Sequence, residues 1–511
     1  MTRSIFVVRS LSGDRLLVWL GRSVVGLVGV LALFLISANA QTQNGMAYPI
    51  DLQTTLRLAG AQNLDIRIAQ SKLQRSRANQ LMAWEKFLPW MAPGAAFERR
   101  DGMSISSVNG VIEDANYAFN LPGYQIQANV PVGDAIFNAL SARQLVRAAA
   151  NALDAQFQNS TLEAALSYFQ TLEDKARANV EHQAAVISAT YQKELHHAVA
   201  AGIAFKGDEL RVKTETERYH IALQQWIQRQ RDSSARLADV LRMDSSIELI
   251  PENSDLVPVM LFDVQTPVQG LIQQAYMARP EIRQSQALMA AANAQRKGAI
   301  YGPIIPTLSM NMFYGGLNGN WDSYASPNHY ATSSPPPVPN PNPSANFYPS
   351  GRNNGRTQDI LFGVNWRIGP GGLGDLGAIR AASARLDTEQ LRGQKVIDQI
   401  ARQVVQSFTR VRSYYQQISM ARGNVQSARE TLRLTEGRKL YGVGNVLEVI
   451  QAQQSLERAS TEYVVALAEF NKAQYELTRA VGGLRGNVMP QSSARASKLK
   501  AYEYHWRRSN P

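Results

Sequence analysis

The clearest pattern of apolar and polar positions is a seven-residue repeat near the C-terminal end of the chain. Large residues recur beside alanines placed three positions behind them: Val449, Leu456, Tyr463, Phe470 and Leu477, with Ala452, Ala459, Ala466, Ala473 and Ala480. A heptad sustained over this length predicts a helix in a coiled coil. Methyl-sized side chains let the partner helix approach closely, which leaves little room for a concave catalytic site in this half of the chain.

Long stretches without proline predict very long helices. Residues 132–250 and 371–489 contain no proline, and proline is the residue that breaks helix interiors. Glycines interrupt the first stretch at 202–207 and the second at 441–445, and glycine permits the left-handed backbone that ends a helix. Each stretch therefore predicts a long antiparallel helical hairpin, with its tip at Gly202 or Gly442.

The two halves of the chain follow the same plan. The context of Asn63-Leu64-Asp65-Ile66 returns at Arg279-Pro280-Glu281-Ile282. The spacing between matching positions grows after Pro306, which indicates an insertion rich in Pro, Asn and Ser, a composition typical of an extended surface loop. We expect this organisation: a first repeat over 41–260 (helix, two strands, hairpin with its tip near 202–207), a second repeat over 261–485 (helix, two strands with a Pro-rich loop at 322–356, hairpin with its tip near 441–445), and a basic, flexible tail over 486–511.

Four segments before the hairpins alternate apolar and polar residues with the period of a strand. They are 124–130, 308–314, 360–368 and, more weakly, 90–97. Such alternation fits a soluble sheet or the wall of a membrane barrel. If it is a barrel, we expect a lipid-facing row and a water-facing row: Tyr124, Ile126, Ile360, Phe362, Val364 and Trp366 toward lipid, and Gln125, Gln127 and Asn365 toward water.

Four strands cannot close a barrel. Each unpaired backbone group at an open edge in lipid costs several kcal/mol. A chain whose strands face lipid must therefore oligomerise to close the sheet.

The first 40 residues are predicted to be a secretory signal peptide. Scattered arginines precede the apolar run from Val24 to Ile36, and Ala38-Asn39-Ala40 offers the small residues of a cleavage site before Gln41. The run is short for a membrane span. The chain has no cysteine, which excludes disulfides, thiolate metal sites, a cysteine nucleophile and N-terminal lipidation.

Neither charge nor motifs indicate chemistry on a substrate. The formal net charge is +12, but the basic residues are scattered through helical segments rather than gathered in a nucleic-acid recognition module. No two histidines have the i, i+4 spacing of a helical metal site, and no catalytic or cofactor-binding element stands out. We therefore expect no metal, no cofactor, no nucleic-acid partner and no enzymatic activity.

The motifs together resemble the TolC-like outer membrane efflux protein family. The resemblance rests on residues 441–453, on Arg279-Pro280-Glu281-Ile282 and on the turn after Pro131, and it covers about residues 50–485. It implies an α+β, mainly α fold and a homotrimer whose protomers each give four strands to a 12-stranded transmembrane β-barrel, with coiled-coil hairpins in the periplasm. Such proteins are passive exit ducts of tripartite efflux pumps or type I secretion systems. Their partners are a periplasmic adaptor (membrane fusion) protein and an inner-membrane transporter.

The resemblance also implies site residues at the hairpin tips. An acidic residue after each tip narrows the periplasmic aperture in the family, and Asp208, possibly with Glu209, and Glu448 occupy these positions. The family has aspartate where this chain has Glu448, and an acid in the first turn of a helix is also stabilised by the helix dipole alone. The residues expected to contact the adaptor are Gly202, Gly207, Gly442, Gly444 and Asn445.

One alternative function stays open at this point. A soluble periplasmic coiled-coil scaffold or adaptor would have the same helices, with the strands in a small sheet domain. We disfavour a di-iron enzyme in a helical bundle, although the Glu-x-x-His spacing of that class occurs twice, at Glu194–His197 and Glu217–His220.

Overall fold

The computed structural model describes residues 47–105, 112–252, 256–321, 352–440 and 445–484. The predicted signal peptide, most of the predicted Pro-rich loop and the predicted tail lie outside these ranges. The chain divides into two compact units. Unit 1 comprises Met1–Leu58, Ala164–Val257 and Met420–Ala468, and unit 2 comprises Ala59–Glu163, Pro258–Ser419 and Glu469–Pro511.

The elements follow one order twice. The first half contains β1 (Ala47–Ile50), α2 (Leu52–Gln62), α3 (Leu64–Glu85), β2 (Trp90–Ile105), β3 (Ile112–Pro131), α4 (Val132–Ala200), α5 (Lys206–Leu241) and β4 (Glu248–Pro251). The second half contains α6 (Val268–Ala278), α7 (Pro280–Tyr301), the 3-10 turn η1 (Gly302–Ile304), β5 (Thr307–Trp321), β6 (Arg352–Asn365), α8 (Leu376–Leu440) and α9 (Val446–Val481). The predicted mainly α fold with two long hairpins and four further strands is confirmed.

A residue with a left-handed backbone lies just after the C-terminal end of α4, α5 and α9. Helix α4 has 69 residues, which corresponds to about 100 Å at 1.5 Å per residue. It ends just before Gly202, whose φ is 74°. Helix α9 ends before Gly482, which has a φ of 86°, whereas α5 ends at Leu241 and the residue that follows it, Arg242, adopts a φ of 58° despite its side chain. The cap of α5 is therefore a residue with a Cβ atom in the left-handed region, a conformation that is strained for such residues and not for glycine.

The heptad rows of α9 are buried as predicted. All five alanines of the small row are buried, and Val449, Phe470 and Leu477 of the large row are fully buried. In unit 1, Val449 and Ala452 pack in one apolar cluster with Tyr191 of α4 and Val212 of α5. In unit 2, the α9 residues from Phe470 onward form a core with α6, α7 and α8.

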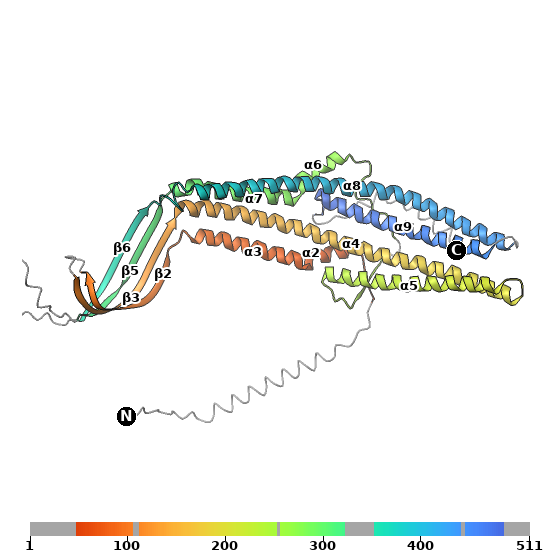
Figure 1. Ribbon diagram of the computed structural model, residues 1–511, viewed down its shortest axis with the longest axis horizontal. Coiled ribbons are helices and arrows are strands. Elements are labelled where there is room, and N and C mark those ends of the chain that lie inside the picture. Colours follow the sequence, from red (N-terminus) through yellow and green to blue (C-terminus); the bar gives the residue numbers. More distant parts are fainter. Residues whose placement is uncertain (1–46, 106–111, 253–255, 322–351, 441–444, 485–511) are drawn as a thin grey trace, which may run out of the picture. The chain divides into compact units, whose positions relative to one another are not determined.

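The four strands β2, β3, β5 and β6 form one antiparallel sheet in unit 2, in that order (Figure 1). They are longer than the alternating segments in the sequence: β2 has 16 residues and β3 has 20. β6 begins at Arg352, inside the range expected for the Pro-rich loop. Backbone hydrogen bonds between the strands extend beyond the segments in which apolar and polar residues alternate. The alternation therefore marks only the part of each strand that carries an apolar face.

A second, smaller sheet was not predicted. In unit 1, β1 pairs in parallel with β4, from Ala47 with Glu248 to Ile50 with Pro251. Side chains of the first hairpin hold β4 in place: Ser234 Oγ accepts a hydrogen bond from Leu249 N at 2.6 Å, and Lys175 Nζ donates to Pro251 O at 2.9 Å. This sheet joins the beginning of the first repeat to its end.

Candidate functional site

The large sheet has one apolar face. Directly paired residues point to the same side of a sheet, so the register defines the rows on this face. The rows are Tyr124 with Tyr314, Ile126 with Met312 and Ile360, Ala128 with Met310 and Phe362, and Val130 with Leu308 and Val364. Five of the six residues expected to face lipid therefore share a face, and all but the half-buried Ile126 are exposed in the single chain.

The sixth residue, Trp366, lies just beyond the end of β6. Its indole Nε1 donates a hydrogen bond to the backbone oxygen of Ile304 at 3.1 Å, which ties the end of β6 to the turn before β5. A tryptophan with an exposed ring and a satisfied polar edge is typical of a membrane interface.

The opposite face carries amide and hydroxyl groups. Gln125 Nε2 donates to Asn311 Oδ1 at 2.9 Å, and Asn365 Nδ2 donates to Ser309 Oγ at 3.4 Å. Leu361 lies on this face as well, in register with Asn311. The half-buried Phe313 pairs with Gln125 and the exposed Trp90 pairs with Gln127, so both also lie on this face. The face therefore mixes polar groups with a few large apolar side chains, and neighbouring residues Leu361 and Phe362 point to opposite sides of the same strand.

Both edges of this sheet are open within the described chain. β2 pairs only with β3, and β6 pairs only with β5. Each edge presents a row of backbone donors and acceptors that can pair with another strand.

The first hairpin tip is built by glycine geometry and exposes two apolar side chains. Gly202 N bonds Val199 O and Ile203 N bonds Ala198 O, both at 3.0 Å, the pattern of a helix ended by a left-handed residue. The ring of Phe205 covers Gly207 so closely that a Cβ there would lie 2.3 Å from it. Ile203 is 81% exposed and Phe205 is 74% exposed, so the tip offers an apolar surface.

The two acids after the first tip have different surroundings. Glu209 is buried and binds Lys206 Nζ at 2.6 Å and His196 Nδ1 at 2.9 Å. The hydrogen bonds from Lys206 and His196 lower the pKa of Glu209, so it is a structural contact between α4 and α5. Asp208 is half-buried and lies 3.4 Å from the guanidinium of Arg211. Of the pair, Asp208 is the acid with the exposure an aperture needs.

At the second tip, Gly442 and Gly444 lie outside the described residues. Asn445 caps α9, because its Oδ1 accepts a hydrogen bond from Leu447 N at 3.1 Å. Glu448 is in the first turn of α9 and lies 3.3 Å from Arg438 of α8. An exposed ion pair of this kind contributes at most about 1 kcal/mol to the free energy of unfolding. A contribution to stability is therefore a weak reason for an acid at this position.

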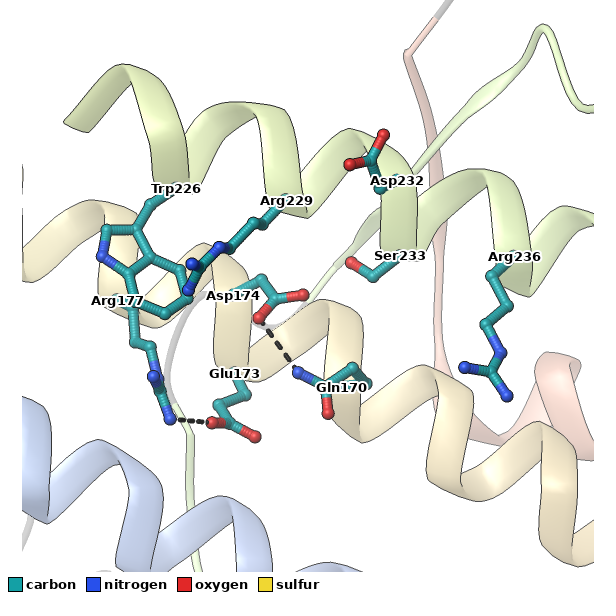
Figure 2. Close-up of a pocket in the computed structure, with 9 residues that line it drawn as sticks. All are labelled: Gln170, Glu173, Asp174, Arg177, Trp226, Arg229, Asp232, Ser233 and Arg236. Atoms are coloured by element: carbon teal, nitrogen blue, oxygen red, sulfur yellow. Dashed lines mark hydrogen bonds and ion pairs between the residues drawn. The ribbon is translucent and has the colours of Figure 1, made fainter. Parts of the chain in front are cut away.

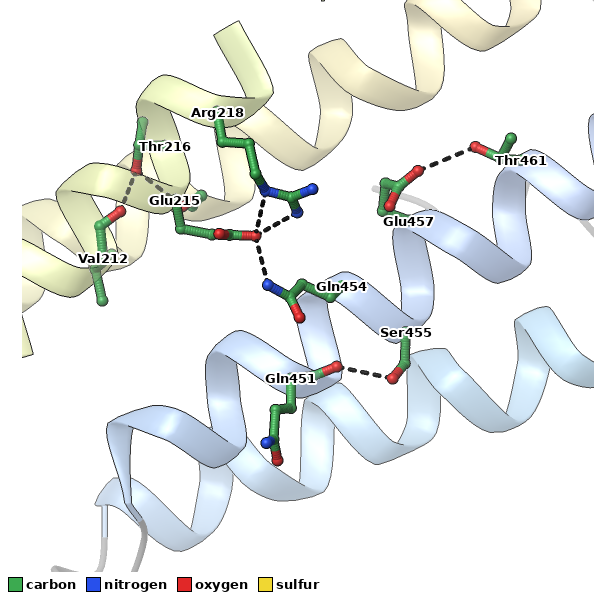
Figure 3. A network of polar contacts seen from close by, with 10 residues as sticks. Val212, Glu215, Thr216, Arg218, Gln451, Gln454, Ser455, Glu457 and Thr461 are labelled. Carbon is green, nitrogen blue, oxygen red and sulfur yellow. Dashed lines mark hydrogen bonds and ion pairs between the residues drawn. The ribbon is translucent and has the colours of Figure 1, made fainter. Parts of the chain in front are cut away.

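A polar network joins the two hairpins inside unit 1 (Figure 3). Glu215 of α5 accepts hydrogen bonds from Arg218 and, at 2.9 Å, from Gln454 of α9. Burial opposes ionisation of Glu215, but the bonds from Arg218 and Gln454 outweigh it and lower the pKa. Glu181 of α4 is buried nearby, and burial together with the charge of Glu457 raises its pKa to about 7. The heptad predicts that this part of α9 is buried, but no sequence signal identifies these partners.

The Arg279-Pro280-Glu281 motif forms a buried ion cluster in unit 2. Arg279 donates to the backbone oxygens of Arg479 (3.0 Å) and Ala480 (3.4 Å), at the C-terminal end of α9. Glu281 pairs with both Arg279, at 3.2 Å, and Arg479. Burial, and then the charge of Arg479, lowers the pKa of Arg279 to about 10. The motif thus fastens the beginning of α7 to the end of α9, where a cation complements the helix dipole.

Two kinds of feature are absent from the described ranges. No helix there is both long enough and apolar enough to cross a bilayer. No group of three or more His, Asp or Glu side chains there is arranged to hold a metal ion.

Comparison with known proteins agrees with this geometry. The family described as outer membrane efflux protein matches residues 343–483. No curated protein matches the chain.

Solved structures of outer-membrane channels have the same fold. The CmeC channel of Campylobacter jejuni has a TM-score of 0.67 at 14% identity, covering 88% of this chain and 88% of its own. VceC of Vibrio cholerae has a TM-score of 0.67 at 16% identity, covering 84% of this chain and 96% of its own. The open MtrE channel of Neisseria gonorrhoeae has a TM-score of 0.65 at 15% identity, covering 88% of this chain and 96% of its own. At these identities the structures establish the fold alone. The chain therefore has the TolC-like fold that its sequence indicated, and its second repeat matches the outer membrane efflux protein family.

Proposed function

We propose that this protein is an outer-membrane exit duct. It conducts passively and works with a periplasmic adaptor and an inner-membrane transporter, in a tripartite efflux pump or a type I secretion system. The family match and the shared fold support this proposal. The observation that carries it is the large sheet, which has a continuous apolar face, a second face that holds the amide and hydroxyl groups among a few apolar residues, and two edges that are open within the described chain.

The apolar face favours lipid as its environment. Its rows, from Tyr124 to Val364, run across three adjacent strands without a charged residue. Soluble proteins rarely leave a contiguous apolar patch larger than a few hundred Å² in water, because exposure costs about 25 cal/mol per Å². A bilayer removes this cost, and the polar face with Gln125 and Asn311 then lines water. A soluble scaffold gains nothing from such a face.

The open edges favour assembly. In lipid, every unpaired N–H and C=O along β2 and β6 costs several kcal/mol. Pairing β6 of one protomer with β2 of the next satisfies both edges. Three protomers with four strands each then give a 12-stranded barrel, with an even number of strands as in known barrels.

The tips are the proposed contacts for the adaptor. The first tip presents Ile203 and Phe205 around Gly202 and Gly207, and exposed apolar groups of this kind favour burial against a partner. At the second tip, Asn445 and the neighbouring glycines are proposed for the same role. Asp208 and Glu448 are proposed to set the charge of the aperture.

The test is to express the full chain, fractionate the cells, and purify the protein from its fraction. An exit duct is recovered with outer membranes, needs detergent, has the mass of a trimer in native mass spectrometry and gives steady current in planar bilayers. Recovery of a monomer from the periplasm without detergent would instead support the soluble scaffold.

A further inference from the structure

The second face of the large sheet, proposed above to contact water, carries one charge among mostly uncharged side chains. Across the described rows that run from Thr307 to Gly315 on β5, Asp359 is the single charged residue, and it is exposed. The large apolar residues of these rows are Phe313, which is half-buried, and Trp90 and Leu361, which are 53% and 68% exposed. Apolar groups left in water favour contact with the apolar part of a dissolved molecule.

Three of these side chains lie close together on β5 and β6. Phe313 and Asp359 are direct partners in the register, and Leu361 is the partner of Asn311, two residues before Phe313. Directly opposed residues on one face of a sheet have Cβ atoms about 4.5–5.5 Å apart, and diagonal neighbours are about 7–8 Å apart. One small molecule can therefore touch the ring, the carboxylate and the leucine at the same time.

Two glycines make room for the Phe313 ring. A Cβ atom on Gly123 would lie 3.0 Å from Phe313 Cζ, and one on Gly315 would lie 2.8 Å from it. The tip of the ring thus occupies the space that side chains would take at these two positions. The ring therefore lies against the backbone of β3 and β5, in the row that contains Asp359.

The aromatic ring in the depression between α4 and α5 has different surroundings (Figure 2). Arg177 and Arg229 lie over the Trp226 ring, 4.6 Å and 4.4 Å from its centroid, so the chain itself supplies the cations that such a ring attracts. Within the described residues no arginine or lysine lies over Phe313 or Trp90 in this way. An external cation can therefore reach these two rings.

We propose that this part of the sheet binds small organic molecules that carry both an aromatic ring and a positive charge. Phe313 and Leu361 contact the aromatic ring, and Asp359, together with the electron-rich face of Phe313, attracts the cation. Such binding rests on the proposed channel function and goes further, because it defines a class of cargo that the wall of the duct holds during passage.

Current through the purified full chain in planar bilayers tests the proposal with three probes. Benzyltrimethylammonium has a ring and a permanent positive charge, tetramethylammonium has the charge alone, and benzenesulfonate has a ring with the opposite charge. We expect benzyltrimethylammonium to block the steady current, with a half-blocking concentration at least about twofold lower than that of either other probe.

Three variants assign the block to these residues. Phe313→Leu removes the aromatic ring but keeps an apolar side chain, and it should raise the half-blocking concentration about two- to tenfold. Asp359→Asn removes the charge and should raise this concentration about two- to fivefold. Glu98→Gln is the matched control, because it neutralises an exposed acid on the same face of β2, about 20 Å along the strand from Ala92. It should leave the block unchanged.

The outcomes separate the binding of aromatic cations from the channel itself. Steady current with no block, with equal block by the three probes, or with equal effects of Asp359→Asn and Glu98→Gln would overturn the binding and leave the channel intact. A parent protein that forms no trimer and passes no current would overturn both. The trimer mass and the unblocked current of each variant show that it has folded and assembled.

Discussion

Adjacent residues Leu361 and Phe362 offer a matched test of the sheet facing. They occupy one strand, they are exposed to a similar degree, 68% and 72%, and they point to opposite faces. Replacing Phe362 with lysine places a charge on the face proposed to contact lipid. Replacing Leu361 with lysine places the same charge beside Asn311, on the face proposed to contact water.

The expected penalty depends on depth. Phe362 is three residues from the end of β6 at Asn365, about 10 Å along the strand at 3.3 Å per residue. Lysine on a lipid face costs about 2–4 kcal/mol at the midplane and about 0–1 kcal/mol near the interface. We therefore expect about 1–3 kcal/mol per protomer for Phe362→Lys, or about 5- to 150-fold in an equilibrium constant. Val364→Lys should cost less and Ile360→Lys more, because they lie closer to and further from the strand end.

Trimer yield in isolated outer membranes, read on unheated gels, and urea unfolding in lipid vesicles measure this penalty. We expect a small effect of Leu361→Lys and losses that rise from position 364 through 362 to 360. Equal yields for Leu361→Lys and Phe362→Lys, or a larger loss at 361, would refute the assignment of the faces.

Three further predictions concern charged groups in the helices. Replacing Asp208 with asparagine and Glu448 with glutamine in one variant should reduce the cation preference of the reconstituted channel. An unchanged reversal potential would show that both acids have only a local structural role. Arg279→Met should destabilise unit 2 by about 3–5 kcal/mol, because it leaves Glu281 with only part of its buried pairing; denaturant unfolding checks this against Arg410→Met, an exposed pair expected to cost under about 1 kcal/mol. Glu181 has a folded pKa of about 7, above its ordinary value of 4.5, so the stability of the protein should fall as pH rises from about 4.5 to about 7. In Glu181→Gln the unfolding temperature should depend less on pH across this window. A pH dependence equal to that of the parent would exclude Glu181 as the cause.

The fold could be predicted from the sequence wherever burial of one face of a helix or strand imposes a regular spacing of apolar residues. The alanine row from Ala452 to Ala480 repeats because one face of α9 is buried throughout, and the rows around Phe362 alternate because a strand has two faces. Both patterns follow from local geometry, and the structure confirms both.

Contacts between distant segments could not be predicted in this way. The heptad shows that α9 is buried but not that Gln454 meets Glu215, since many polar residues on α5 would satisfy the same pattern. The pairing of β1 with β4 involves four residues on each strand, too few for a period. The Arg279 motif was visible in the sequence, but its role depends on the end of α9, about 200 positions away.

The unpaired margins of β2 and β6 also bear on how the protein matures. If the chain is exported and assembles as proposed, each new copy carries two open strand edges until sister copies pair with them, and these edges can pair with other extended peptides. The interval between export and assembly is then the time of greatest risk of aggregation. A cell that makes more of this chain than it can assemble should therefore accumulate misassembled material rather than a reserve of ready subunits.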